Sequence, residues 1–362
     1  MSKPLFVFAG GGTGGHIFPG LAVATSLKQS APRARLLFTG TNRAVEQSIL
    51  RDTGFDSLTL QVPPIATLPA HPFRFMSGHL KDWSLARQLV AREHPACVIG
   101  LGGLASLAVS CAAGRRGIPV ILLEQNVIPG RATRRLARRF PVCTSFEETS
   151  RYLSGAKQII CTGNPLRTEI TELAGVSATE IANRNTLLIL GGSQGSKQVN
   201  QAVLDAVRQA DPCLLDAWRV IHQTGPADVE SVRSFWQSLR IPATVEPFFD
   251  DLPQQYARAS LVISRSGATT LAELACLGLP SLLLPFQHAR DDHQTVNARI
   301  FQDAGAAGLI DMRCEQIMPS LARLITDVGL RETMSDRCRS LARHDAADTV
   351  AALICQLTSE VH

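Results

Sequence analysis

Two glycine-rich turns, each directly after a short apolar run, constrain the fold of this chain most. Leu5 to Ala9 precede Gly10-Gly11-Gly12-Thr13-Gly14-Gly15-His16, and Leu187 to Leu190 precede Gly191-Gly192-Ser193-Gln194-Gly195. A buried strand followed by a glycine turn and a helix opens a βα unit of a parallel sheet. One such opening in each half of the chain predicts an α/β fold with two doubly wound domains.

Chain length supports two domains. At 362 residues the chain exceeds the size at which a single hydrophobic core keeps growing. Cys161 to Arg167 supply Gly, Asn and Pro where a linker is expected. We therefore predict an N-terminal domain over residues 1–162, a C-terminal domain over residues 163–345, and a terminal helix over residues 346–362 that packs back toward the N-terminal domain.

Cysteine usage and hydropathy indicate the class of protein. The nine cysteines are scattered singly, without a Cys-x-x-Cys pair, so we expect reduced thiols in the cytosol and no metal site. No apolar run reaches the roughly 18 residues of a bilayer-spanning helix, and the first residues do not resemble a signal peptide. Any membrane contact is therefore expected to be peripheral. A net charge of +5 favours anionic partners.

The first glycine turn fits the G-x-G-x-x-G pattern of dinucleotide-binding folds. A dehydrogenase of that kind needs an acidic residue at the end of the second strand, where it holds the ribose hydroxyls. Here the expected strand ends in Thr39-Gly40-Thr41, and the first acid, Glu46, follows well beyond it. The pattern disfavours NAD, so no cofactor is expected. A tight turn without a ligand is the alternative role of the glycines.

The C-terminal half offers a candidate anion site where a strand passes into a helix. Ser264 to Thr270 bring Arg265, hydroxyl groups and backbone N–H groups to one helix terminus, which includes Ala268 and Thr269. Within two turns, the Glu273 carboxylate can accept hydrogen bonds from ribose hydroxyls or simply complement the helix dipole. Gln287 and Gln294 follow the strand ending in Pro285, and their amides suit sugar hydroxyls.

A basic face is also predicted. Four arginines recur at helical spacing, at Arg131, Arg134, Arg135 and Arg138. A solvated helix face is one interpretation, and a contact with anionic lipid is the other. The apolar stretch from Pro63 to Met76 is a candidate for insertion into such a surface or for a buried loop. The basic residues lack interleaved aromatic side chains, which disfavours nucleic acid.

Seven motifs occur together along the chain: Gly11 to Pro19, Glu124-Gln125-Asn126, Gly163 to Arg167, Gly191 to Gly195, Phe249-Asp250-Asp251, Arg265 to Ala268 and Pro285-Phe286-Gln287. Their order and spacing resemble the MurG family of N-acetylglucosaminyltransferases. The resemblance implies a GT-B architecture, in which two Rossmann-like domains face a cleft. It also implies inverting transfer from UDP-N-acetylglucosamine to the C4 hydroxyl of the muramyl sugar of undecaprenyl-diphosphate-linked lipid I. The implied products are lipid II and UDP, and the resemblance leads us to expect a peripheral protein at the cytoplasmic face of the membrane.

The resemblance also implies roles for individual residues. Donor contacts are expected at Thr13, Gly14, Gly15, Asn126, Arg167, Ser193 and Gln294. Phe249 is expected to meet the uracil and Glu273 the ribose. His16 is the candidate general base, because a neutral imidazole can accept the proton of an attacking hydroxyl. Positioning of the substrate is its alternative role, and Glu124 is a weaker candidate base.

Two departures from the family pattern fall on the expected acceptor side. Gly102 to Leu107 lack the aromatic residue often found there, and Leu123 replaces a histidine before Glu124. Two other functions stay open at this point. A UDP-N-acetylglucosamine 2-epimerase can share the fold and the donor, and a nucleotide-sugar sensor can retain the pocket without chemistry.

Overall fold

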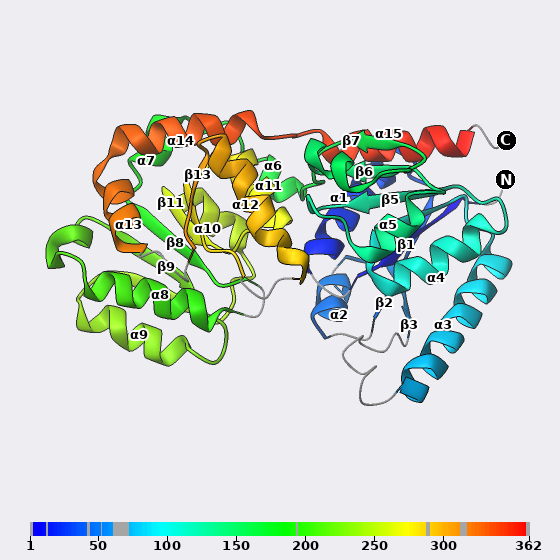
Figure 1. Ribbon diagram of the computed structural model, residues 1–362, viewed down its shortest axis with the longest axis horizontal. Coiled ribbons are helices and arrows are strands. Elements are labelled where there is room, and N and C mark those ends of the chain that lie inside the picture. Colours follow the sequence, from blue (N-terminus) through cyan, green and yellow to red (C-terminus); the bar gives the residue numbers. More distant parts are fainter. Residues whose placement is uncertain are drawn as a thin grey trace. The chain divides into compact units, whose positions relative to one another are not determined.

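The structure is a computed structural model that describes residues 3–11, 14–41, 44–51, 53–60, 72–192, 195–286, 290–311 and 317–359. Two compact units divide the chain (Figure 1). Unit 1 comprises Met1–Arg167 and His344–His362, and unit 2 comprises Thr168–Arg343. The division after Arg167 falls slightly later than the sequence suggests. The guanidinium of Arg167 stacks over the Phe18 ring, 4.3 Å from its centroid, and so ties the linker to unit 1.

Unit 1 is built on a parallel sheet of seven strands in the order β3-β2-β1-β4-β5-β6-β7. Its strands are β1 (Leu5–Gly10), β2 (Arg35–Thr41), β3 (Asp56–Leu60), β4 (Cys97–Gly102), β5 (Val120–Glu124), β6 (Val142–Thr144) and β7 (Ile159–Cys161). β1 pairs with β2 on one side and with β4 on the other, so the strand order reverses there. Such a switch point is where open α/β sheets bind ligands.

The helices of unit 1 include the last one of the chain. They are α1 (Gly14–Ser30), α2 (Ala44–Arg51), α3 (Pro72–Glu93), α4 (Gly103–Gly114), α5 (Arg131–Leu136), η2 (Glu147–Tyr152) and α15 (Ala346–Ser359). Val350 and Ile354 of α15 are buried in the same hydrophobic cluster as Val23 and Leu27 of α1. Ser26 also donates a hydrogen bond to Asp348, with 2.6 Å between the two oxygens. The terminal helix therefore completes the core of unit 1.

Unit 2 repeats the same plan with six parallel strands in the order β10-β9-β8-β11-β12-β13. The strands are β8 (Thr186–Leu190), β9 (Arg219–Gln223), β10 (Ala243–Glu246), β11 (Leu261–Ser264), β12 (Ser281–Leu283) and β13 (Ala307–Leu309). Here the order reverses at β8, the strand that precedes the second glycine turn. The two sheets confirm the prediction of two doubly wound α/β domains.

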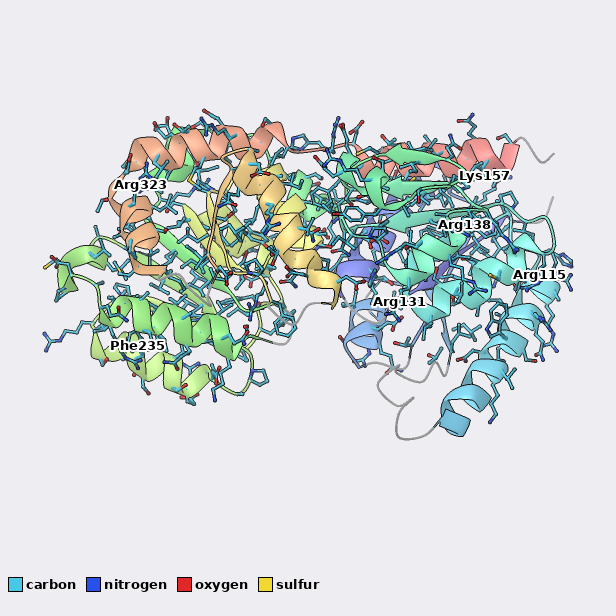
Figure 2. All side chains as sticks on the ribbon, viewed as in Figure 1. Arg115, Arg131, Arg138, Lys157, Phe235 and Arg323 are labelled. Carbon is cyan, nitrogen blue, oxygen red and sulfur yellow. The ribbon has the colours of Figure 1, made fainter. Side chains whose placement is uncertain are left out.

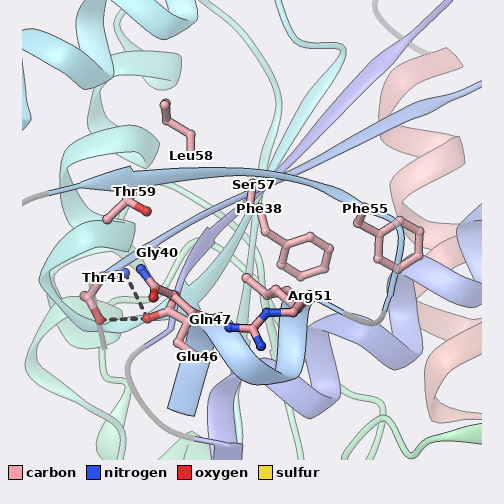
Figure 3. A pocket seen from close by; sticks show the side chains of 11 residues that line it. Phe38, Gly40, Thr41, Glu46, Gln47, Arg51, Phe55, Ser57, Leu58 and Thr59 are labelled. Atoms are coloured by element: carbon pink, nitrogen blue, oxygen red, sulfur yellow. Dashed lines mark hydrogen bonds between the residues drawn. The ribbon is translucent and has the colours of Figure 1, made fainter. Parts of the chain in front are cut away.

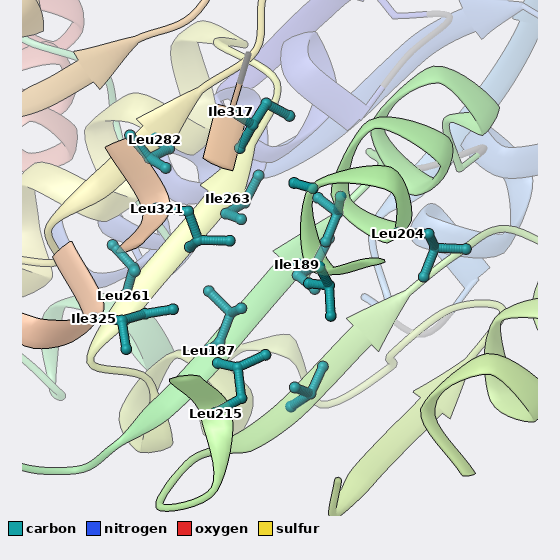
Figure 4. Packing of buried hydrophobic residues seen from close by; sticks show 14 of the residues in the cluster. Leu187, Ile189, Leu204, Leu215, Leu261, Ile263, Leu282, Ile317, Leu321 and Ile325 are labelled. Atoms are coloured by element: carbon teal, nitrogen blue, oxygen red, sulfur yellow. The ribbon is translucent and has the colours of Figure 1, made fainter. Parts of the chain in front are cut away.

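Helices pack on the sheet of unit 2 through an extended apolar core. They are α6 (Thr168–Thr171), α7 (Ala178–Ala182), α8 (Lys197–Arg208), η3 (Pro212–Leu215), α9 (Val229–Ser238), α10 (Leu252–Arg258), α11 (Ala268–Leu277), η4 (Arg290–Asp292), α12 (His293–Asp303), α13 (Ile317–Thr326) and α14 (Val328–Ser340). Figure 4 shows part of this core, with side chains of β8, β11 and α13 in one cluster: Leu187, Ile189, Leu261, Ile263, Leu321 and Ile325.

The arginine-rich helix is shorter than its sequence pattern predicts. Helix α5 ends at Leu136, and the N–H groups of Arg139 and Phe140 both donate to the Leu136 carbonyl, which closes a turn. Arg138 therefore lies beyond the helix, although it is exposed like Arg131. Among the helices in the described ranges, none has both the length and the hydropathy needed to cross a bilayer.

Candidate active site

The N-terminus of α11 has the features of the anion site that the sequence predicts for unit 2. The helix begins at Ala268, four residues after the end of β11 at Ser264. Gly267 occupies the N-cap position and has no side chain to accept a hydrogen bond from the first turn. The first N–H groups of a helix carry partial positive charge and attract phosphate oxygens. Ala268 is buried and Thr269 half-buried at this terminus, where the sequence predicts them.

Arg265 holds the segments around this helix terminus in place through four hydrogen bonds. Its Nη1 donates to the carbonyls of Leu284 at 3.0 Å and Pro285 at 2.8 Å, while Nη2 donates to Ser196 Oγ at 2.7 Å and Gln198 Oε1 at 2.8 Å. Burial lowers the pKa of Arg265 to about 10, so the guanidinium still carries its charge at neutral pH. Arg265 thus joins the segment after β12 to the start of α8, a structural role that the sequence does not reveal.

Glu273 is buried one and a half turns into α11, with only 4% of its surface exposed. Tyr256 of α10 donates its hydroxyl to Glu273 Oε2 at 3.0 Å. An ionised carboxylate only accepts hydrogen bonds, so the Tyr256 hydroxyl is a suitable donor. The bond between them fixes the orientation of the carboxylate. Tyr256 carries no motif signal, so sequence reasoning missed it.

Gln294 orders the segment that follows β12. Its Oε1 accepts from the backbone N–H of Phe286 at 2.9 Å, and its backbone carbonyl accepts from Ser266 Oγ at 2.8 Å. Asn297, one turn later, donates to the Ser266 carbonyl at 3.4 Å. These bonds tie the start of α12 to the turn before α11. Gln287, the other amide predicted here, lies outside the described residues.

The second glycine turn requires its glycines for steric reasons. Gly195 has a φ of +76°, and a Cβ atom there would collide with the carbonyl oxygen of Thr224. Ser193 lies outside the described residues. Phe249, the predicted uracil contact, follows β10 and is buried, and its N–H donates to Gln223 Oε1 at 3.2 Å. Gln223 is a further candidate at this site, and no motif in the sequence points to it.

In unit 1, the first glycine turn joins β1 to the helix that carries His16. Gly10 has a φ of +118°, and a Cβ atom there would collide with the carbonyl oxygen of Gly102 at the end of β4. His16 is half-buried, and its ring lies against Gly102, where an added Cβ would be 3.2 Å from Nε2. Gly14 is buried and Gly15 exposed, and Thr13 lies outside the described residues.

Arg167 contacts α1, the helix that carries His16. The guanidinium of Arg167 stacks on Phe18, two residues after His16 in α1. The sequence places these two residues at opposite ends of unit 1, so the contact could not be read from spacing.

Glu124 organises the loop that holds Asn126. Its Oε1 accepts from the N–H of Asn126 at 3.1 Å, and its Oε2 accepts from the N–H of Gly130 at 3.0 Å. Burial raises the pKa of Glu124, while hydrogen bonds from Thr133, Gly130 and Asn126 oppose the rise. Both oxygens serve the loop, which favours a positioning role over that of a base.

Glu46 lies closer to the end of β2 than its place in the sequence predicts. The sequence puts this acid well beyond β2, but α2 returns it to the strand end, where Oε2 accepts from the Thr41 N–H at 2.9 Å and the Thr41 hydroxyl at 2.7 Å (Figure 3). A Cβ atom on Gly11 or Gly40 would collide with Oε1. The Glu46 carboxylate therefore abuts the first glycine turn, close to the position of a ribose-binding acid in dinucleotide folds.

A cavity of about 400 Å³ lies beside Glu46, between α2 and the strands β2 and β3 (Figure 3). Its lining combines the rings of Phe38 and Phe55 with the polar side chains of Gln47 and Arg51.

Within the described ranges, no three His, Cys, Asp or Glu side chains lie close enough together to hold a metal ion.

Comparison with known proteins places the chain in a family. The model of the glycosyltransferase family 28 N-terminal domain matches residues 6–141, and that of the C-terminal domain matches residues 186–350. The chain belongs to glycosyltransferase family 28. The membership confirms the family resemblance carried by the seven motifs and makes the protein a glycosyltransferase.

Curated relatives extend over nearly the whole chain. A protein of Myxococcus xanthus is 35% identical over 97% of this chain and 92% of its own length, and one of Thermodesulfovibrio yellowstonii is 37% identical over 84% of each. Both are named UDP-N-acetylglucosamine–N-acetylmuramyl-(pentapeptide) pyrophosphoryl-undecaprenol N-acetylglucosamine transferase.

Solved structures confirm the GT-B class. MurG of Acinetobacter baumannii has a TM-score of 0.77 and 27% identity, covering 98% of this chain and 99% of its own. A UDP-GlcNAc 2-epimerase of Neisseria meningitidis has a TM-score of 0.66 at 17% identity, covering 98% of this chain and all of its own. The second likeness concerns the fold alone.

We expect UDP affinity to depend on the Tyr256–Glu273 pair. Glu273→Ala removes the charged acceptor predicted for the ribose and should weaken UDP binding by about 1.5 to 3 kcal/mol. Tyr256→Phe removes only the bond that orients the carboxylate and should cause a smaller loss. Isothermal titration calorimetry with UDP measures both. A folded Glu273→Ala variant with the affinity of the parent would show that Glu273 has no part in nucleotide binding.

Proposed function

We propose that this chain is the transferase that moves N-acetylglucosamine from UDP-N-acetylglucosamine to the C4 hydroxyl of the muramyl sugar of lipid I. The reaction inverts the anomeric configuration and yields lipid II and UDP. The observation that carries the proposal is the 35% identity over 97% of the chain to a relative named for this transfer. Family 28 membership of both halves supports it.

Unit 2 holds the donor in this proposal. The N-terminus of α11, with Ala268 and Thr269, takes the diphosphate, and the buried charge of Arg265 adds to its positive potential. The carboxylate of Glu273, oriented by Tyr256, accepts hydrogen bonds from the ribose hydroxyls. Phe249 meets the uracil. Backbone N–H groups at the glycine turn that contains Ser193, and at the start of α8, add to the phosphate site. The amides of Gln287 and Gln294 contact the sugar.

In the proposed transfer, charge develops at two places, the acceptor hydroxyl and the departing diphosphate. The acceptor hydroxyl attacks the anomeric carbon opposite UDP, while His16 takes its proton as general base. Negative charge grows on the departing diphosphate, and the α11 terminus stabilises it. The family resemblance also implies donor contacts at Thr13, Gly14, Gly15, Asn126 and Arg167.

The acceptor is a lipid, so unit 1 is proposed to bind the anionic cytoplasmic surface of the membrane peripherally. Helix α3 exposes Leu80 by 68% and Leu85 by 39%, with Lys81 exposed between them. Arg115 lies over the ring of Trp83 on the same helix, 5.4 Å from its centroid. Figure 2 labels further basic side chains of unit 1, Arg131, Arg138 and Lys157. Nucleic acid is not a partner in this proposal.

Incubation of the purified protein with UDP-N-acetylglucosamine and a lipid I analogue tests the function directly. We expect a product one N-acetylglucosamine heavier than the acceptor, and release of UDP only when the acceptor is present. Formation of the manno sugar from the donor without an acceptor would instead identify an epimerase. Binding of UDP-N-acetylglucosamine without either product would indicate a sensor.

Loss of His16 should slow the chemical step. A missing general base typically costs about 10² to 10⁴ in rate. We expect His16→Gln and His16→Ala to lower the single-turnover rate in this range, with donor affinity unchanged. His94, an exposed histidine after α3, provides the control variant His94→Gln, which should keep the parent rate. A normal chemical step in folded His16 variants at saturating substrates would rule out the base.

A further inference from the structure

The carboxyl end of β9 connects two segments to which the proposed function assigns different parts of the nucleotide. Gln223 is the last residue of β9 and is 3% exposed. Its Nε2 donates to the carbonyl of Gly192 at 2.9 Å, and its Oε1 accepts from the N–H of Phe249 at 3.2 Å. Because one partner accepts and the other donates, only one orientation of the amide satisfies both. One buried side chain thus links the glycine turn after β8 to the segment after β10.

The residue before Gln223 is held in place from the other side. His222 Nδ1 accepts from Trp236 Nε1 at 3.3 Å, so its Nε2 carries the proton and donates to Asn200 Oδ1 at 3.1 Å. Burial lowers the pKa of His222 to about 3, which keeps the ring neutral at physiological pH. Asn200 in turn donates to the carbonyl of Thr224 at 3.0 Å. The backbone on both sides of Gln223 is therefore fixed.

The residues after Gln223 contact the same two segments. The Thr224 N–H donates to the Glu246 carbonyl at 3.0 Å, and the Gly225 N–H donates to the Pro247 carbonyl at 3.0 Å. Gly195, at the far end of the glycine turn, packs against Thr224 and Gly225 so closely that a Cβ atom would collide with both. These contacts give Gln223 a rigid base from which to hold Gly192 and Phe249.

We propose that Gln223 is a positioning residue that fixes the separation between Gly192 and Phe249, and that it thereby sets the preference for a uridine diphosphate over shorter uridine nucleotides. The inference rests on the proposed function, which assigns the uracil to Phe249 and phosphate to the turns beside it. A ligand that spans two sites gains affinity when the sites are already held at the right distance. A ligand that engages mainly one of the two sites gains less affinity from a fixed distance between them.

Two substitutions disrupt the hydrogen bonds of Gln223 in different ways. Gln223→Leu removes both hydrogen bonds, whereas Gln223→Glu retains an acceptor for the Phe249 N–H and sets a carboxylate against the Gly192 carbonyl. We expect both to raise the KM for UDP-N-acetylglucosamine about tenfold, equivalent to about 1.4 kcal/mol. We expect kcat at saturating donor to stay within about twofold, because the binding lost is common to ground state and transition state. Affinity for UDP should fall more than affinity for UMP.

Gln255 offers a matched control. It is a buried glutamine of the same unit, and its Nε2 donates to Asp251 Oδ2 at 2.8 Å. Gln255→Leu should leave the KM and the ratio of UDP to UMP affinity unchanged. Turnover by the wild type tests the proposed function, while the ratios between variant and wild type, including UDP binding without an acceptor, test the role of Gln223.

A second measurement does not depend on the folding of any variant. In the intact wild type without ligand, the Phe249 amide should exchange with deuterium slowly, because it donates to a buried acceptor. Rapid exchange of that amide would overturn the inference. Equal losses of UDP and UMP affinity, or a fall in kcat with an unchanged KM, would overturn it as well.

Discussion

Every proposed contact with the substrates depends on the parallel arrangement of the strands. Because parallel strands end at the same edge of a sheet, the segments that follow them converge there. In unit 2 this edge gathers the glycine turn after β8, Phe249 after β10 and the α11 terminus after β11. The order reverses at β8, which separates the connections on its two sides and leaves room for a ligand.

Polar side chains at these edges mostly hold loops in place. Arg265 bonds to two carbonyls and to two side chains of the α8 turn, and Glu124 accepts from two N–H groups of the Asn126 loop. Gln294 and Gln223 each fix a backbone N–H near the strand ends. Buried polar groups need such partners, since an unpaired one costs about 1 to 3 kcal/mol. The same bonds preorganise the edge for binding, which lowers the entropy that a ligand must lose there.

The fold could be predicted because its signals are local. An apolar run, a glycine turn and a helix follow one another within about 20 residues at Leu5 and at Leu187, and steric limits force glycine at positions such as Gly195. The bonds that orient the candidate site join residues far apart in the chain. Tyr256 reaches Glu273 and Gln223 reaches Phe249 across separate elements, and no spacing rule reveals either pair.

Glu46 shows the same limit in the opposite direction. Its distance from the strand along the sequence predicts that no acid reaches the first glycine turn, yet α2 returns the carboxylate to Thr41 and Gly11. The lack of an acid at the expected spacing in the sequence therefore does not exclude a carboxylate beside the glycine turn. By contrast, the family assignment is specific, because seven short motifs must occur in one order to produce it.

Hydrogen–deuterium exchange of the intact protein, with and without UDP, tests most directly whether the strand ends of unit 2 hold the nucleotide. If they do, we expect UDP to slow exchange most in peptides that contain Gly191 to Ser196, Phe249 and Arg265 to Glu273. Peptides from the core of unit 1, such as Val120 to Leu123 in β5, should be unaffected. Protection confined to the turn from Gly10 to His16, with none in unit 2, would contradict it.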